Sequence, residues 1–259
     1  MDYNKIIQKQ FDQQAENFSR WSVTHNTEYM DQYLDFCRIQ SNDTFLDIAC
    51  GTGEFAHYTA ARVKQAIGVD ISPGMIELAK KNAGNQSNIN FLCHNVENLP
   101  LETDRFSIVN CRSAFHHMHQ YDQIFMEMIR CCQPGGRISI QDIIVYEDLE
   151  VDAYFESLEK AIDICHHQTC SSEFLTDLYT SEKVPILQTL VVTVELHFQE
   201  YIRHAKQTEE NMKRISELLS NGLSHPKISD YFVIKDDDLF FKRNVFLILG
   251  QKPSNQESS

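Results

Sequence analysis

The chain alternates between short runs of apolar residues and longer stretches in which apolar residues recur at steps of three and four. Short apolar runs are typical of buried β-strands, and the stepped pattern is typical of amphipathic helices. Two helical patterns come first, and strands and helices then alternate with short links between them. Such alternation implies right-handed crossovers and a parallel sheet with helices on both faces. The predicted strands are 44–49, 65–70, 89–93, 106–111 and 137–145, and the predicted helices are 4–18, 26–36, 54–63, a helix begun by Ser72 and Pro73, and 120–132.

The pattern changes after residue 145. Two helical segments, a strand, a long amphipathic helix and a final strand are predicted there, at 148–164, 172–179, 187–196, 198–219 and 239–249. The sequence has no linker rich in proline and glycine, so we expect one domain over 1–253, with N-terminal helices in 1–40. We expect the segment 148–220 to be a helical lid inserted after the fifth strand, and the polar end 254–259 to be a disordered tail.

Charge and composition narrow the classes of partner. The chain carries 37 acidic and 23 basic residues, a formal net charge of −14. That charge repels phosphate backbones and anionic membrane surfaces, so nucleic acid is not expected as a partner. No apolar stretch approaches the roughly 18 residues of a membrane span, and the polar start lacks a secretion signal. The eight scattered cysteines favour a reducing compartment. We therefore expect a cytoplasmic protein without a membrane span, and its oligomeric state stays open.

A glycine loop after the first predicted strand is the strongest local signal. Gly51 and Gly53 stand between that strand and a helix, so the backbone can turn sharply and a ligand can approach the free N–H groups at the helix start. Asp70 ends the second strand about 20 residues further on, where a carboxylate can accept both hydroxyl groups of a ribose. The spacing also fits the Gly-x-Gly-x-x-Ala pattern of dinucleotide-binding dehydrogenases. These residues indicate a nucleotide cofactor and leave its kind open.

Three features favour a sulfonium nucleoside over a dinucleotide. Asp47 lies inside the first strand, where it can face a cationic amino-acid group. Two predicted helices precede that strand, whereas a dinucleotide-binding fold usually starts close to its first strand. Asn95 follows the third strand and places a side-chain amide where it can bind the edge of an adenine.

Five segments together resemble the class I S-adenosylmethionine-dependent methyltransferases, namely 47–53, 68–72, 95–100, 112–117 and 134–136. The similarity is to the small-molecule branch that includes the methyltransferases of ubiquinone and menaquinone biosynthesis. It is dense over 40–145 and looser at 11–18, 163–166 and 245–253. The resemblance implies a Rossmann-like, seven-stranded, mostly parallel sheet whose last strand is antiparallel. It also implies S-adenosyl-L-methionine as cofactor and methyl transfer to a small-molecule acceptor.

The resemblance further implies which residues contact the cofactor, namely Asp47, Gly51, Gly53, Asp70, Ile71, Met75, Asn95, Val96 and Arg112. The first three residues and the segment at Arg112 would hold the methionine portion. Asp70 would hold the ribose, and the others would surround the adenine. Two positions depart from the family pattern. Asn95 stands where many relatives carry Asp and keeps an acceptor oxygen, whereas Phe18 stands where many carry Tyr and lacks its hydroxyl.

His116 and His117 are the candidate catalytic residues. They follow the fourth strand, at the carboxyl edge where open α/β sheets bind ligands. A sulfonium methyl is already activated, so in-line transfer depends mainly on positioning, and a general base is needed only when the acceptor must lose a proton. His117 is preferred, although both histidines could simply pack the following helix. His166, in the predicted lid, is a weaker candidate.

Other interpretations stay open at this point. The cluster of cysteines and histidines at 165–170 is too crowded to offer four convergent zinc ligands, so no metal is expected. A catalytically silent protein that binds S-adenosylmethionine would fit the altered positions at Asn95 and Phe18. An oxidoreductase that uses a nicotinamide dinucleotide is a further alternative.

Overall fold

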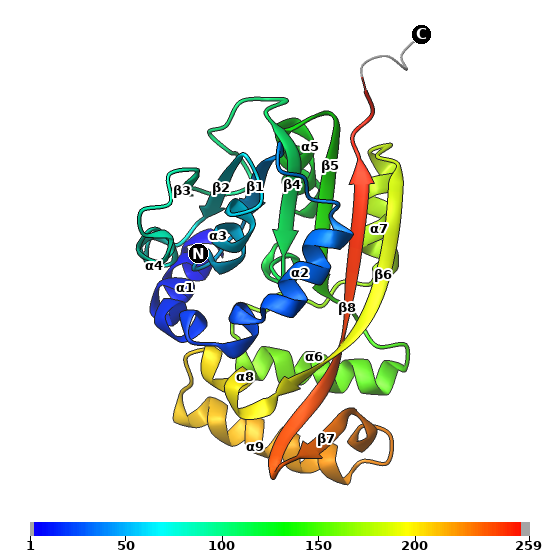
Figure 1. Ribbon diagram of the computed structural model, residues 1–259. Helices are drawn as coiled ribbons and strands as arrows, with labels where there is room; N and C mark the ends of the chain where they lie inside the picture. Colours follow the sequence, from blue (N-terminus) through cyan, green and yellow to red (C-terminus); the bar gives the residue numbers. More distant parts are fainter. Residues whose placement is uncertain (1–2, 255–259) are drawn as a thin grey trace.

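The computed structural model describes residues 3–254, and it places helices on both faces of one twisted sheet (Figure 1). Most of the predicted tail, residues 255–259, lies outside the described residues. The sheet runs in the order β3-β2-β1-β4-β5-β8-β6, and β7 pairs with the outer part of β8. The strands are β1 Thr44–Ile48, β2 Gln65–Asp70, β3 Ile89–Cys93, β4 Phe106–Arg112, β5 Cys132–Ile143, β6 Ile186–His197, β7 Phe232–Lys235 and β8 Asp238–Gln251.

The first five strands are parallel, and β8 runs antiparallel to both of its long neighbours, β5 and β6. The expected mostly parallel sheet with a late antiparallel strand is therefore confirmed. All seven expected strands are present, together with the short β7, which the sequence analysis did not predict. Its hairpin with β8 turns through Asp236 and Asp237, which have φ values of 49° and 68°. Two aspartates in the left-handed region form a tight turn without the glycine that usually signals one.

The central strands are mostly apolar because both of their faces are covered. Alternate residues point to opposite faces, so Leu46 and Ile48 pack on one side of β1 and Phe45 on the other. The first side is covered by α5 (Tyr121–Cys131) and α7 (Ser172–Ser181). The second side is covered by α2 (Thr27–Phe36), α3 (Glu54–Ala60) and α4 (Pro73–Ala83).

The first helix, α1 (Tyr3–Ser19), lies beside α4 rather than on the sheet (Figure 1). Asp12 fixes it there, because one carboxylate oxygen accepts hydrogen bonds from the Ser72 hydroxyl at 2.5 Å and from the Gly74 backbone nitrogen at 2.9 Å. A short 3-10 helix, η1 (Ser22–His25), then leads into α2. As a result, α1 crosses the carboxyl edge of the first strands.

The predicted helix over 198–219 is two helices, α8 (Phe198–His204) and α9 (Glu209–Ser224). Gln207 and Thr208 account for the break. The Gln207 side chain donates to the carbonyl oxygens of Ile162 and Ile202, and the Thr208 hydroxyl accepts the Asn211 backbone N–H at 3.1 Å. Thr208 is therefore an N-cap, and this cap outweighs the apolar stripe that continues across it.

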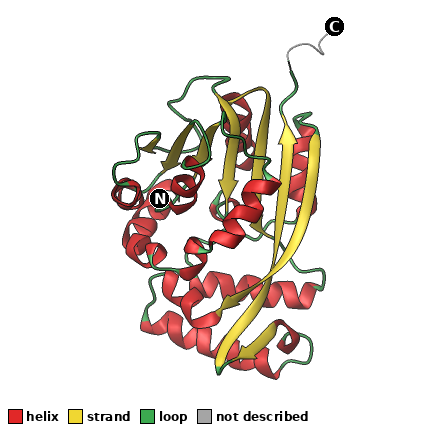
Figure 2. Cartoon of the chain, viewed as in Figure 1, coloured by secondary structure: helices red, strands yellow, loops and turns green. Residues whose placement is uncertain are grey.

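Helices gather around one end of β6 and β8 (Figure 2), and these helical additions come from two places in the chain. One is α6 (Leu149–Ile162) after β5, and the other is α8, α9 and β7 between β6 and β8. They share a hydrophobic cluster with the outer ends of β6 and β8, centred on Phe155, Phe198 and Phe241. The predicted insertion 148–220 thus also contains β6, which is a strand of the main sheet, and α7, which packs on that sheet. None of the helices among the described residues is long and apolar enough to cross a membrane.

Candidate active site

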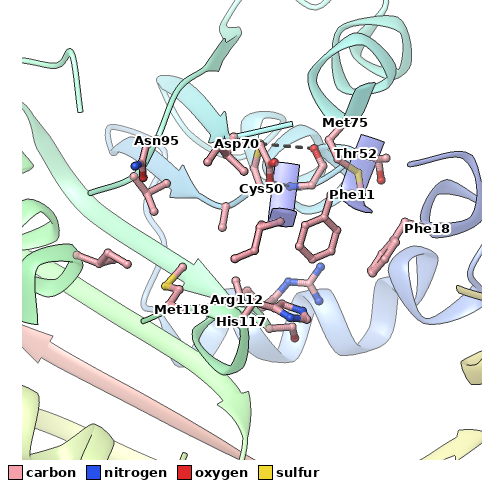
Figure 3. A pocket seen from close by; sticks show the side chains of 18 of the residues that line it. Phe11, Phe18, Cys50, Thr52, Asp70, Met75, Asn95, Arg112, His117 and Met118 are labelled. Carbon is pink, nitrogen blue, oxygen red and sulfur yellow. Dashed lines mark hydrogen bonds between the residues drawn. The ribbon is translucent and has the colours of Figure 1, made fainter. Parts of the chain in front are cut away.

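A cavity lies at the carboxyl ends of β1, β2 and β4, underneath α1 (Figure 3). Its floor comes from the loops after these strands and after β3. Its roof comes from α1 and η1, which contribute Tyr3, Ile7, Phe11, Phe18 and Trp21. The described residues that form its wall all fall between positions 3 and 124. Figure 3 shows Phe11 between the Asp70 side of the cavity and the His117 side.

The two glycines of the loop after β1 have different tasks. Gly53 has a φ of +79°, and a Cβ atom there would come within 2.7 Å of Ala79 and 2.8 Å of Phe91. Gly51 has a φ of +56°, and a Cβ atom there would meet nothing within 4 Å. Gly51 lines the cavity, so its missing side chain leaves room for a ligand. Gly53 instead lets α3 pack close to α4 and β3.

Asp70 stands at the end of β2 and faces the cavity. One oxygen of its carboxylate accepts the Gly51 backbone N–H at 2.9 Å, and the other accepts the Ser72 backbone N–H at 2.9 Å. Burial raises the pKa of Asp70, and hydrogen bonds from the backbone of Ser72, Gly51 and Ile71 oppose that shift. Each oxygen keeps a further lone pair that a hydroxyl group can use.

Asp47 lies behind the loop rather than on the wall of the cavity. Its side chain is buried in β1 and accepts a hydrogen bond from the Asn110 amide at 2.7 Å. Burial raises the pKa of Asp47 to about 6, although Asn110 and the charge of Arg112 oppose the shift. Asp47 is therefore not among the residues that line the cavity, and its contact with a ligand stays a prediction.

The loop after β3 supplies the other end of the cavity. Asn95 and Val96 line it as expected, together with Ile71 and Met75 from the start of α4. The Asn95 side-chain oxygen accepts the Glu97 backbone N–H at 3.0 Å, and its amide nitrogen donates to the Glu97 carboxylate at 3.1 Å. Glu97 also lines the cavity and was not among the predicted residues.

Arg112 lines the cavity at the end of β4, where its guanidinium lies 4.8 Å from the centre of the Phe55 ring. Phe18 lines the part of the roof at the end of α1. Behind it, His204 of α8 stacks on Trp21 and contacts the edge of Phe18, each with 4.9 Å between ring centres. Residues of the predicted lid therefore brace the roof from behind.

The two candidate histidines point in different directions. His117 lines the cavity, and His116 turns into the interior, where its Nδ1 atom lies 2.6 Å from the buried carboxylate of Asp142. Burial disfavours the charged form of His116, but the Asp142 carboxylate outweighs this and raises its pKa. His116 is therefore not among the residues that line the cavity, and its role as a base stays a prediction. His166 is also turned away, since its ring pairs with Glu156 at 3.0 Å.

His117 is held as a neutral ring. Its Nδ1 atom lies 3.1 Å from the carbonyl oxygen of Cys165, which can only accept a hydrogen bond. Nδ1 must therefore carry the proton, and Nε2 is left as an acceptor. Burial, followed by the proximity of His116, lowers the pKa of His117 well below its usual range.

Most of the roof was not predicted from the amino-acid sequence. Ile7 and Phe11 belong to an amphipathic pattern that is equally consistent with a helix packed on the core, and Tyr3 and Trp21 lie outside the predicted helix 4–18. The signal present was the looser resemblance at 11–18, which covered Phe11 and Phe18 only. Among residues 3–254, no group of His, Cys, Asp and Glu side chains is arranged to hold a metal ion.

Comparisons with known proteins identify similar sequences and similar folds. Residues 46–140 match the family model described as a methyltransferase domain. The chain is 23% identical over 207 residues to the Bacillus subtilis protein named uncharacterized methyltransferase YcgJ, covering 79% of this chain and 82% of that protein. It is 38% identical over 96 residues to the demethylmenaquinone methyltransferase of Deinococcus radiodurans, covering 36% of this chain and 40% of that enzyme.

A crystal structure of a methyltransferase from Bacillus halodurans superimposes with a TM-score of 0.78 at 20% identity, covering 87% of this chain and 99% of that one. Similarity at this level of identity supports the fold. The chain spans less than half the length of the Deinococcus enzyme, so the acceptor of that enzyme is not carried over.

Proposed function

Since the chain belongs to the S-adenosylmethionine-dependent methyltransferases by its domain at 46–140 and by its fold, we propose that it transfers a methyl group to a small-molecule acceptor. The proposal rests on one observation, which is that Gly51 and Asp70 line the same cavity. A backbone that a ligand can approach closely stands there beside a carboxylate with free lone pairs.

In this proposal the cofactor lies along the floor of the cavity. Asp70 accepts the ribose hydroxyls, and Gly51 lets the ligand lie against the loop. The apolar side chains of Ile71 and Met75 flank the adenine, while Asn95 and the Val96 backbone meet its polar edge. Arg112 lies at the opposite end, where it would meet the carboxylate of the methionine portion. The residues present therefore fit S-adenosyl-L-methionine.

Asp47 and Gly53 act indirectly in this proposal. Gly53 fixes the position of α3 against α4, and Asp47 supports the floor near the methionine portion through Asn110. Their expected contacts with the methionine portion become supporting contacts one layer behind it.

The remaining space, between Phe11, Phe18 and His117, would hold the acceptor. Bound S-adenosylmethionine supplies an electrophilic methyl group on a positively charged sulfur. The roof of α1 excludes water and holds the acceptor in line with that group, which supplies most of the rate acceleration for such a displacement. A cavity enclosed by one helix suits a small acceptor better than a polymer.

His117 would orient the acceptor. Its unprotonated Nε2 atom can accept a hydrogen bond from a hydroxyl or amine. Its lowered pKa makes it a weak base, so it directs a lone pair of the acceptor toward the methyl group rather than removing a proton completely. Replacing His117 with Asn should therefore raise KM more than it lowers kcat.

Isothermal titration calorimetry tests the proposal. S-adenosylmethionine and its demethylated product should bind with micromolar-range affinity, and Asp70→Ala should weaken both. Asp177→Ala changes an exposed carboxylate on α7 and serves as the matched control. No binding at millimolar cofactor contradicts the proposal. Binding without turnover across a broad screen of hydroxyl, amine, thiol and activated C–H acceptors would favour the catalytically silent alternative.

A further inference from the structure

A second cavity of about 740 Å³ opens between the end of α1 and the helices α8 and α9. Its volume falls within the range of roughly 300–1,000 Å³ that is typical of small-molecule sites. The surrounding elements are joined on either side, because the Lys206 ammonium donates to Gln13 at 3.1 Å and the Ser22 hydroxyl donates to the Glu200 carboxylate. The cavity is therefore built from two separate parts of the chain, 17–21 and 199–212.

The charge of this cavity is opposite to that of the protein as a whole. The protein has a formal net charge of −14, yet the wall of the cavity carries the cations Arg20, Arg203 and Lys206 against the single carboxylate of Glu200. Arg20 also pairs with Glu16 at 3.4 Å, but both side chains are more than three-quarters exposed and such a pair contributes little. The cavity thus has the electrostatics of an anion site.

Buried polar atoms in the same wall point to a ligand as well. His204 is 6% exposed and its Nδ1 atom is buried without a hydrogen-bond partner. The side-chain oxygen of Gln207 is also buried without a hydrogen-bond partner. Buried polar atoms are usually satisfied, so unpaired ones in a cavity wall favour a site that a polar ligand completes.

Trp21 lies between this cavity and the candidate active site, because it lines both of them. On the side of the second cavity it stacks on His204, and on the other side it meets the edge of Phe18 at 6.2 Å between ring centres. A ligand that reaches past Trp21 would have one end beside the cofactor and the other among the cations.

We propose that the two cavities are the two ends of one acceptor site, and that the acceptor carries a phosphate or carboxylate group bound by Arg20, Arg203 and Lys206. The inference rests on the proposed function, and it adds the chemical class of the acceptor. The aromatic rings of Phe18 and Trp21 hold the middle of the molecule, and the atom that is methylated lies on the His117 side.

The position of the cations distinguishes this proposal from a simpler explanation. Arg203 and Lys206 stand at the carboxyl end of α8, where cations stabilise a helix through its dipole. Arg20 likewise follows the carboxyl end of its own helix, α1, so the helix dipoles account for each cation beside its helix but not for their meeting at one cavity. Convergence of cations from two elements on one cavity is what an anionic group requires.

The test uses phenyl phosphate as the anionic probe and phenol as its neutral counterpart. Trp21 is the only tryptophan of the chain, so its fluorescence reports on the wall between the two cavities. Both probes are titrated into the wild type and into the double variant Arg203→Gln/Lys206→Gln, with the demethylated cofactor product bound. Lys81→Gln removes an exposed cation of α4 and is the matched control.

We expect saturable binding of phenyl phosphate to the wild type and to Lys81→Gln, and affinity lower by about tenfold or more in the double variant. Phenol should bind more weakly and equally to all three. Absence of saturable phenyl phosphate binding, equal affinity for phenyl phosphate and phenol, or an unchanged affinity in the double variant overturns the inference.

Calorimetry with the demethylated cofactor product, on the same samples, separates the two proposals. Normal cofactor binding with no preference for the anionic probe removes this inference alone. Loss of cofactor binding in the wild type removes the proposed function, whatever the fluorescence shows. Normal cofactor binding by the double variant also shows that its fold is intact.

Discussion

The carboxylate of Asp70 accepts the backbone N–H of Gly51 at 2.9 Å, and this bond ties the end of β2 to the loop after β1. The same carboxylate accepts the Ser72 N–H at the start of α4. One side chain therefore fixes two loops of the cavity while it faces the space that the proposed cofactor occupies. Its structural and binding roles can be separated by measuring both.

Asp70→Asn should weaken the binding of the demethylated cofactor product by about tenfold or more and lower the free energy of unfolding by about 1–2 kcal/mol. The amide nitrogen of Asn cannot accept a hydrogen bond, so either Gly51 or Ser72 loses its partner. Calorimetry and urea unfolding measure the two effects. Asp177→Asn should change neither, and wild-type affinity in Asp70→Asn would contradict the assignment.

Alanine at the two loop glycines should give opposite results. Gly53→Ala places a Cβ atom 2.7 Å from Ala79, so we expect about 2–4 kcal/mol of lost stability with overpacking and an unfavourable φ combined. Gly51→Ala meets no atom within 4 Å and should cost about 1–2 kcal/mol for its φ alone, but its methyl group should weaken cofactor binding. Urea unfolding and calorimetry on both variants check this. Equal loss of stability in Gly53→Ala and Gly51→Ala would show that close packing at Gly53 does not add to the cost of its substitution.

His117 should make the protein less stable at acidic pH. Its pKa is lower in the folded state than the value of about 6.5 for an exposed histidine. Below that pH His117 binds a proton in the unfolded chain but stays neutral in the folded chain. The stability that is present above pH 6.5 is therefore lost as the pH falls. His116, whose pKa is raised, contributes with the opposite sign.

His117→Asn keeps a donor for the Cys165 carbonyl and removes the titration. Between pH 7 and pH 5 this variant should lose up to about 2 kcal/mol less stability than the wild type. Urea unfolding across this range provides the measurement, with His25→Asn at an exposed position as the control. Parallel curves for His117→Asn and the wild type would show that the ring is protonated normally.

Asp142→Asn should destabilise the segment that positions His117. The fully buried Asp142 carboxylate accepts from the backbone nitrogens of Ala114 and His116 and from the His116 ring. We expect a loss of about 2–4 kcal/mol in unfolding free energy and a lower pKa for His116, measured by urea unfolding and by NMR titration. Asp35→Asn, on an exposed face of α2, is the control. An unchanged His116 titration would contradict the pairing.

The strands of the sheet and part of the cavity floor could be predicted from the amino-acid sequence. The strands are mostly apolar runs, and the positions of Gly51, Asp70 and Asn95 follow from where those runs end. These signals are local, because a parallel strand buried on both faces leaves a pattern that does not depend on distant residues. In parallel strands the carboxyl ends meet at one edge, so residues at three strand ends are brought together.

Which side chains face the cavity, and which helix closes it, depend on contacts between residues far apart in the sequence. His116 and His117 are neighbours in sequence, and the carboxylate of Asp142 on β5 determines which of them turns inward. The apolar stripe of α1 could cover a sheet or a cavity, and the bonds of Asp12 to α4 settle the choice. An amphipathic pattern records that a face is buried and does not record what it is buried against.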